Sequence, residues 1–296
     1  MPAEILAHPR FAVARACFVD GILALYEGDA LLTRLMGEAA RGVIFLVLVC
    51  LEAGHDEDDP STWLTLGRLK QQLEPYGLSS PRHIEGLVSL LVHNGFLESI
   101  PSQSDRRLRF LRATGKMLSV DHDWLVANYQ PLQSMFPDPG YDEVLRRDPA
   151  FRRVLRRVAI DSLANGARIL GGNPEIMMFH ERDAGILILF NLAQLAGGPD
   201  GRPAEFDYKE TGARFGVSRT HVQKILQDAE SAGLLAITGR GRRCVSLTPA
   251  IWAALDRFTA ESLSGHDLVF AIAKRGIAHA RSKSQLQQTV VTARVR

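Results

Sequence analysis

A cluster of polar and basic residues between Gly216 and Pro249 has side chains that suit contact with phosphates and with the edges of nucleic-acid bases. After Ser218, apolar residues recur at helical spacing and predict a buried face made of Val222, Ile225, Leu226 and Ala229. The remaining positions predict an outer face that carries Arg219, Thr220, His221, Gln223 and Lys224, with Gln227 at its margin. These residue types can donate to phosphates or read bases in a major groove, whereas a plain solvated helix face is the alternative.

Three arginines follow that helix at the tip of a predicted hairpin. Gly239 and Gly241 alternate with Arg240, Arg242 and Arg243, and the segment joins two short runs with strand character, LLAIT and CVSL. The arginines have no evident role in a core at this position. They favour a wing that lies on phosphates or in a minor groove, and thus favour nucleic-acid binding over a solvated surface.

The glycines before the cluster have the spacing of a helix-turn-helix. Gly212 stands where two helices would cross closely, Gly216 would form the turn, and Val222 would face inward. Ser218 is well placed as the N-cap of the second helix, and Gly233 as its left-handed stop.

The chain can be aligned with itself. HPRF at 8–11 matches DPAF at 148–151, and 76–97 matches 215–235 so that Gly95 stands opposite Gly233. Each copy predicts a leading amphipathic helix (11–26; 151–164), a very apolar helix (39–53; 183–195), a short helix, a serine-capped helix and a hairpin. Chance similarity of helical patterns is the alternative.

The expected fold class is therefore mainly α with small β-hairpin wings (α+β), as two tandem winged helix-turn-helix domains. Their expected bounds are 1–127 and 149–262, with a linker at 128–148 and a C-terminal helix and basic tail at 263–296. The linker is placed by Pro131, Pro137, Pro139 and Gly140, which argue against a continuous helix. In the first copy, Ser80 would cap the corresponding helix. The exposed face of that helix, which includes Arg82 and His83, is less basic than the face in the second copy.

Residues 93–117, HNGFLESIPSQSDRRLRFLRATGKM, resemble the wing of MarR-type regulators, and residues 217–235 are similar to the recognition helix of Crp-like and GntR-like proteins. The resemblance implies that Asp105 orients Arg107 while Arg106 and Arg109 approach the DNA backbone. It also implies a possible small-molecule effector, of unidentified chemistry, with walls that would include Phe11, Phe18, Phe45, Trp63 and Phe136 unless these are plain core. The second wing lacks the Asp, and Leu73 stands where a small residue is expected.

Other chemistry finds little support. GKM at 115–117 and HERDA at 180–184 lack the remaining residues of a phosphate loop and of a zinc-protease motif, so we expect no enzyme activity and no cofactor. HDEDD at 55–59 is interpreted as a solvated acidic loop, and His122 with Asp121 and Asp123 as a surface cluster, in preference to metal sites. The apolar run at 42–51 is too short for a membrane span, and the first residues do not form a signal peptide.

The net charge of +2, from 35 basic and 33 acidic residues, does not by itself indicate nucleic acid. The leading hypothesis is a cytoplasmic transcriptional regulator that binds double-stranded DNA sequence-specifically. A winged-helix interaction or scaffold module and a plasmid replication initiator are the alternatives. One chain would form an intramolecular pseudo-dimer in which the two leading helices pack together, with a homodimer as the other possibility.

Overall fold

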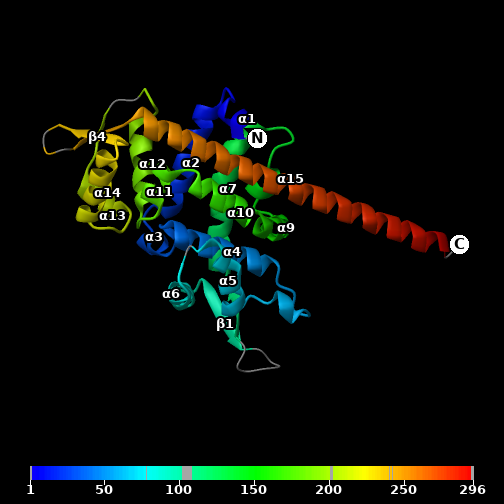
Figure 1. Cartoon of the computed structure of the whole chain (residues 1–296). Coiled ribbons are helices and arrows are strands. Elements are labelled where there is room, and N and C mark those ends of the chain that lie inside the picture. Colours follow the sequence, from blue (N-terminus) through cyan, green and yellow to red (C-terminus); the bar gives the residue numbers. More distant parts are fainter. Residues whose placement is uncertain are drawn as a thin grey trace.

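The computed structural model describes residues 2–77, 79–101, 109–200, 203–239, 241 and 243–294, with side chains up to residue 280. Over these residues the chain is mainly helical, with small antiparallel sheets at its edges (Figure 1). Among the described helices, none combines the length and the apolar character needed to cross a membrane. We refer to residues 2–141 as the first half and to residues 142–294 as the second half.

The first half begins with four helices and ends with a helix pair, a hairpin and a long helix. In chain order its elements are α1 (Pro2–Leu6), α2 (Phe11–Tyr26), α3 (Ala30–Met36), α4 (Ala39–Ala53), a 3₁₀ turn (Pro60–Thr62), α5 (Leu66–Leu73), a second 3₁₀ turn (Glu74–Tyr76), α6 (Pro81–His93), β1 (Leu97–Pro101), β2 (Arg109–Ala113) and α7 (Gly115–Met135). In the hairpin Leu97 stands opposite Ala113 and Pro101 opposite Arg109.

The second half has a similar order of elements. They are α8 (Asp142–Leu145), α9 (Pro149–Ala159), a 3₁₀ turn (Ile160–Ser162), α10 (Leu163–Gly171), α11 (Pro174–His180), α12 (Gly185–Ala196), β3 (Ala204–Glu205), α13 (Tyr208–Arg214), α14 (Arg219–Ser231), β4 (Leu235–Thr238), β5 (Cys244–Leu247) and α15 (Pro249–Arg294). Strand β3, which the sequence did not suggest, adds to the hairpin so that β5 lies between β3 and β4.

The predicted helix caps are confirmed. Ser80 Oγ accepts a hydrogen bond from the amide of His83 at 3.2 Å, and Ser218 Oγ accepts one from the amide of His221 at 3.1 Å. Gly95 and Gly233 both adopt left-handed backbone, with φ of 73° and 72°. These caps satisfy amides and carbonyls that a helix end leaves free, which is why short local sequence signals could place them.

The leading helices do not pack together as the sequence suggested. Instead α2 packs against α7 of its own half and against α12 of the other half. In the same way α9 packs against α15 of its own half and against α4 of the other half. Helices α2 and α9 themselves make at most marginal contact. Both α4 and α12 are almost wholly apolar, and each leading helix packs on the central helix of the other half.

Three predicted boundaries are corrected. Helix α7 continues through Pro131 to Met135, so the non-helical part of the expected linker begins at Phe136. Pro131 lies four residues before the helix end and is buried, and its missing N–H removes one helical hydrogen bond. Helix α9 ends at Ala159 before a 3₁₀ turn, and α15 runs without a break across the expected boundary at 262.

The prediction that Asp121 lies at the surface beside His122 is wrong. Asp121 is only 1% exposed and accepts hydrogen bonds from Arg152 Nη1 at 2.9 Å and from Arg156 Nε at 3.2 Å, both from α9. Arg152 Nη2 also donates to Glu52 of α4 at 3.0 Å. A buried carboxylate needs such partners, and they come from residues about thirty positions away, which local sequence could not indicate.

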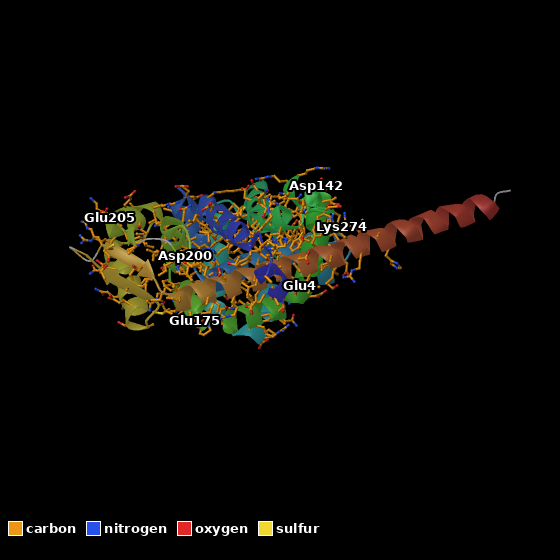
Figure 2. The ribbon with its side chains drawn as sticks, turned by 90° about the horizontal axis from the view of Figure 1, so that it is seen from above. Glu4, Asp142, Glu175, Asp200, Glu205 and Lys274 are labelled. Atoms are coloured by element: carbon orange, nitrogen blue, oxygen red, sulfur yellow. The ribbon has the colours of Figure 1, made fainter. Side chains whose placement is uncertain are left out.

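Helix α15 extends well beyond the body of the molecule (Figure 1). Seen from above, Lys274 lies where the helix leaves the body, and Glu205 of β3 lies at the opposite end (Figure 2). Lys274 forms an ion pair with Glu143 of α8 and lies 5.9 Å from the centre of the Phe270 ring. The packed part of α15, which follows the second hairpin in the chain, contacts α9 and the first half's α7.

Candidate nucleic-acid interface

Helix α14 has the two faces that its sequence predicts. Val222, Leu226 and Ala229 have no exposed surface, and Ile225 is 2% exposed. Four of the residues predicted to contact DNA are exposed on the opposite face: Arg219, Thr220, Gln223 and Lys224. All four lie within the first two turns of the helix, the end that enters a major groove in helix-turn-helix proteins.

The crossing of α13 and α14 requires glycine. A Cβ atom at Gly212 would lie 2.7 Å from the carbonyl oxygen of Val217, well inside van der Waals contact. The Val217 amide donates to the Gly212 carbonyl at 2.9 Å, which closes the turn between the helices. Gly216 has a φ of 69°, in the left-handed region. The predicted roles of Gly212 and Gly216 are thus confirmed.

His221, the fifth polar residue of that predicted face, differs from its neighbours. It is half-buried, and its Nε2 atom lies 2.8 Å from the carbonyl oxygen of Asp183. Farther along the same helix, Asp228 accepts a hydrogen bond from Arg182 at 2.7 Å. The segment before α12 therefore holds α14 at two points, and His221 acts inside the protein as an anchor of the helix.

The hairpin beside α14 is held by a third strand. The amide of Phe206, just after β3, donates to the carbonyl of Arg243 at 2.7 Å, while the Arg243 side chain is exposed. Gly239 and Gly241 both have left-handed backbone, with φ of 76° and 71°. Of the three predicted tip arginines, Arg240 and Arg242 lie outside the described residues.

A fixed carboxylate lies near this basic surface and was missed by sequence reasoning. Asp207 caps α13 by accepting the amides of Lys209 at 2.7 Å and Glu210 at 2.9 Å. The Glu210 and Lys209 amides lower the pKa of Asp207, and the positive charges of Arg243 and Arg219 act in the same direction. Asp207 therefore lies close enough to one arginine of the helix and one of the hairpin to feel both charges. An Asp directly before a helical run was the available signal.

A small cleft of about 70 Å³ separates α14 from the hairpin. Arg219 and Gln223 line it from the helix, and Gly241 lines it from the hairpin tip. Its other walls are Tyr208, Gln227 and Ile237. The structure thus brings the predicted helix residues, with Gln227 at their margin, and the hairpin together on one side, and Tyr208 is a neighbour absent from the predicted set.

The corresponding surface of the first half is less basic. Arg82 and His83 are exposed at the start of α6, but Glu85 lies beside them and pairs with Lys70 of α5. Arg109 is held along its own hairpin, because its Nε donates to Ser99 Oγ at 2.8 Å and its Nη2 to the Ser99 carbonyl at 2.5 Å. Arg106 and Arg107, with Asp105, lie outside the described residues.

The five aromatic residues suggested as effector walls do not form one site. Phe18 and Phe45 line the same internal cavity. Phe11 is absent from the lining of that cavity, Trp63 packs against His55 and Phe110, and Phe136 packs against His8.

The acidic residues 56–59 are exposed, and within the described ranges no cluster of three or more His, Cys, Asp or Glu side chains could hold a metal ion. The sequence matches no protein-family model and no curated protein.

Proposed function

We propose that this chain is a transcriptional regulator that binds double-stranded DNA sequence-specifically through two tandem winged helix-turn-helix units related by duplication. The observation that carries the proposal is the arrangement of α14. Its first two turns present Arg219, Gln223 and Lys224 to solvent next to a hairpin with an arginine-rich tip. Long cationic and amide side chains at the start of such a helix can reach base edges and phosphates.

Recurrent hydrogen bonds support the duplication. Thr114, before α7, donates from Oγ1 to the carbonyls of Gly95 at 2.7 Å and Phe96 at 3.1 Å. Thr248, before α15, donates in the same way to Gly233 at 3.1 Å and Leu234 at 2.9 Å. Each half therefore has an equivalent threonine, Thr114 or Thr248, that joins the end of the hairpin to the end of the preceding helix by hydrogen bonds. The reciprocal crossings of α2 with α12 and of α9 with α4 add a second correspondence.

The two units would divide the work on DNA. Helix α14 would read bases with Arg219, Thr220 and Gln223, and Lys224 and the tip arginines Arg240, Arg242 and Arg243 would contact the backbone. Helix α6 and the first hairpin, with Arg82, His83, Arg106, Arg107 and Arg109, would make the weaker contact. Such a regulator would work in the cytoplasm, and a small-molecule effector would be one way to control it.

The proposal can be tested by selecting bound sequences from a pool of random DNA duplexes. The full chain is expected to enrich a defined motif. Gln223→Ala is expected to lower the free-energy difference between the preferred base and the other bases at one position by about 1–3 kcal/mol, while the preference at the other positions of the motif is unchanged. The control is Gln194→Ala, because Gln194 bonds to Asp20 on a different part of the molecule. Enrichment of no motif by the full chain would contradict sequence-specific binding.

A protein-binding role for the first unit is the second candidate. The pairing of Lys70 with Glu85 and of Arg109 with Ser99 occupies basic side chains that DNA contact would require. In that case only the second unit would touch DNA, and Arg82→Ala would leave the affinity for DNA unchanged. A replication initiator would share the same DNA-binding units, and iterated repeats of the selected motif at an origin would distinguish it from a regulator.

A further inference from the structure

Two turns, one from each half, meet beside α14. One turn follows α3 at Gly37 and leads into α4 of the first half, and the other, at residues 181–184, joins α11 to α12 of the second. The amide of Ala184 donates to the carbonyl of Gly37 at 3.0 Å. Arg41 of α4 adds an ion pair with the carboxylate of Asp183. A backbone hydrogen bond and an ion pair therefore join the two halves at this point.

The turn at 181–184 also holds α14. Nε2 of His221, in the first turn of α14, lies 2.8 Å from the carbonyl oxygen of Asp183. About two turns farther along the helix, Asp228 accepts a hydrogen bond from Nη1 of Arg182 at 2.7 Å. Two contacts so far apart restrict both rotation and sliding of the helix. Asp183 thus contacts α14 through its carbonyl oxygen and the first half through its carboxylate.

Both turns have little freedom to adjust. The amide of Gly37 donates to the carbonyl of Thr33 at 2.7 Å, and a Cβ atom on Gly37 would overlap that oxygen. Ala184 is fully buried and has a left-handed φ of 55°, which a residue with a side chain keeps only where its surroundings impose it. Nη1 of Arg41 donates to the carbonyl of Arg34 at 2.6 Å, and the arginine side chain is only 14% exposed. The arginine end of the ion pair is therefore fixed in the body of the first half.

The turn between α3 and α4 also leads to α6. Helix α3, which ends just before that turn, contacts α6. In Figure 1 it lies between α6 and the α13–α14 pair. A short series of contacts therefore connects α14 to α6 by way of the two turns.

We propose that the two turns form a joint that fixes the separation of α6 and α14, so that the chain selects DNA by the spacing between two half-sites. The joint consists of Gly37, Arg41, Asp183, Ala184 and His221. Selection of the spacing rests on the proposed function, whereas the fixed separation does not. Each base pair added between two half-sites moves one of them by about 3.4 Å along the DNA axis and by about a tenth of a turn around it. Two helices held at a fixed separation can therefore both enter their grooves at only one spacing.

The separation is measured first, on the full chain without DNA, by double electron–electron resonance. Nitroxide labels are placed at Ser89 of α6 and Lys224 of α14, which are both exposed, as unnatural amino acids because the chain has three cysteines of its own. Arg41→Ala is expected to make the distribution of label distances at least about twice as wide. Arg41→Lys, which keeps the positive charge, is expected to restore most of the wild-type width. Arg257→Ala is the control, since Arg257 pairs with Glu175 inside the second half.

The spacing preference is measured second, with duplexes that carry the two selected half-sites separated by spacers of every length up to one helical turn. We expect the wild-type chain to enrich one spacer length at least about ten-fold over its neighbours. Asp183→Asn removes the ion pair with Arg41 and keeps the carbonyl that faces His221. This variant is expected to spread the enrichment over neighbouring spacer lengths while the bases selected within each half-site stay the same. A residue needed only for stability would instead lower binding at all spacer lengths alike.

Equal widths of the distance distribution in the wild-type chain and in Arg41→Ala would overturn the proposal, whatever the DNA result. Enrichment of the same single spacer by the wild-type chain and by Asp183→Asn would also overturn it, as would selection of a motif with no preferred spacing. A narrow distance distribution that depends on Arg41, in a chain that selects no motif, would contradict the proposed function and leave the fixed separation standing.

Discussion

Gly216, in the turn that precedes α14, packs against Ala30 at the start of α3, and a Cβ atom on Gly216 would lie 2.9 Å from the Cβ of Ala30. Nearby, Arg214 pairs with Glu27 at 3.3 Å. Helix α3 also contacts α6 of its own half. One short helix of the first half therefore contacts both α6 and the turn that precedes α14.

Substituting Gly216 tests this contact. Gly216→Ala is expected to destabilise the chain by about 2–3 kcal/mol, because it adds a close contact with Ala30 to the cost of left-handed backbone. Urea denaturation measures the loss. Gly233→Ala is the control, since Gly233 has a similar φ of 72° and nothing within 4 Å of the added atom, so only about 1 kcal/mol should be lost. Equal losses in the two variants would show that the packing against Ala30 contributes nothing.

The basic residues of α14 should govern how DNA affinity depends on salt. Replacing Arg219 and Lys224 by Ala is expected to reduce the slope of log K against log salt concentration by about 1 for each phosphate that the variant no longer neutralises. Fluorescence anisotropy with a labelled duplex measures the slope. Arg146→Ala serves as the control, because Arg146 is an exposed arginine at the end of α8 that pairs with Asp142. A slope unchanged by both substitutions would place α14 away from the phosphates.

The buried pairing of Asp121 should contribute strongly to the native state. Asp121→Asn is expected to cost about 3–5 kcal/mol, because Arg152 and Arg156 would keep their buried charges without their shared carboxylate. The exposed pair of Asp142 with Arg146 gives the comparison, and Asp142→Asn should cost no more than about 0.5 kcal/mol. If chemical denaturation gave similar values for the two variants, the buried cluster would not have the role assigned to it.

Acid should weaken the fold through His266. Its ring packs against Trp124 and Tyr129, and its pKa falls from 6.5 to about 3 through burial and then the charge of Arg156. Between these values the unfolded chain binds a proton that the folded chain does not, so the free energy of unfolding decreases as pH falls from 6.5 towards 3. His266→Gln is expected to remove about 2 kcal/mol of the loss between pH 7 and pH 5. Parallel losses in the variant and the wild-type chain would contradict this assignment.

The sequence predicted what depends on local patterns. Ser80, Ser218, Gly95 and Gly233 act within a few residues of themselves, so their caps and stops could be recognised, as could the apolar face of α14. The polar face was correct except for His221, whose partner Asp183 is 38 positions away and comes from the segment before α12.

Features that depend on distant residues could not be predicted. The burial of Asp121 depends on two arginines of α9, and the crossing of α2 with α12 depends on how the halves pack. Pro131 was interpreted as a helix breaker because its burial at the end of α7 is a tertiary property. The internal cavity lined by Phe18 and Phe45 likewise has walls from α2, α4, α12 and α15, which belong to both halves, and has no counterpart in any single segment.

The central claim is that one chain supplies both DNA-binding units. Footprinting of the selected duplex, combined with native mass measurement of the same complex, tests it most directly. We expect one chain to protect two unlike half-sites about 34 Å apart, with the half-site bound by α14 protected more strongly. Two chains on a symmetric site, each protecting it through α14 alone, would contradict the claim.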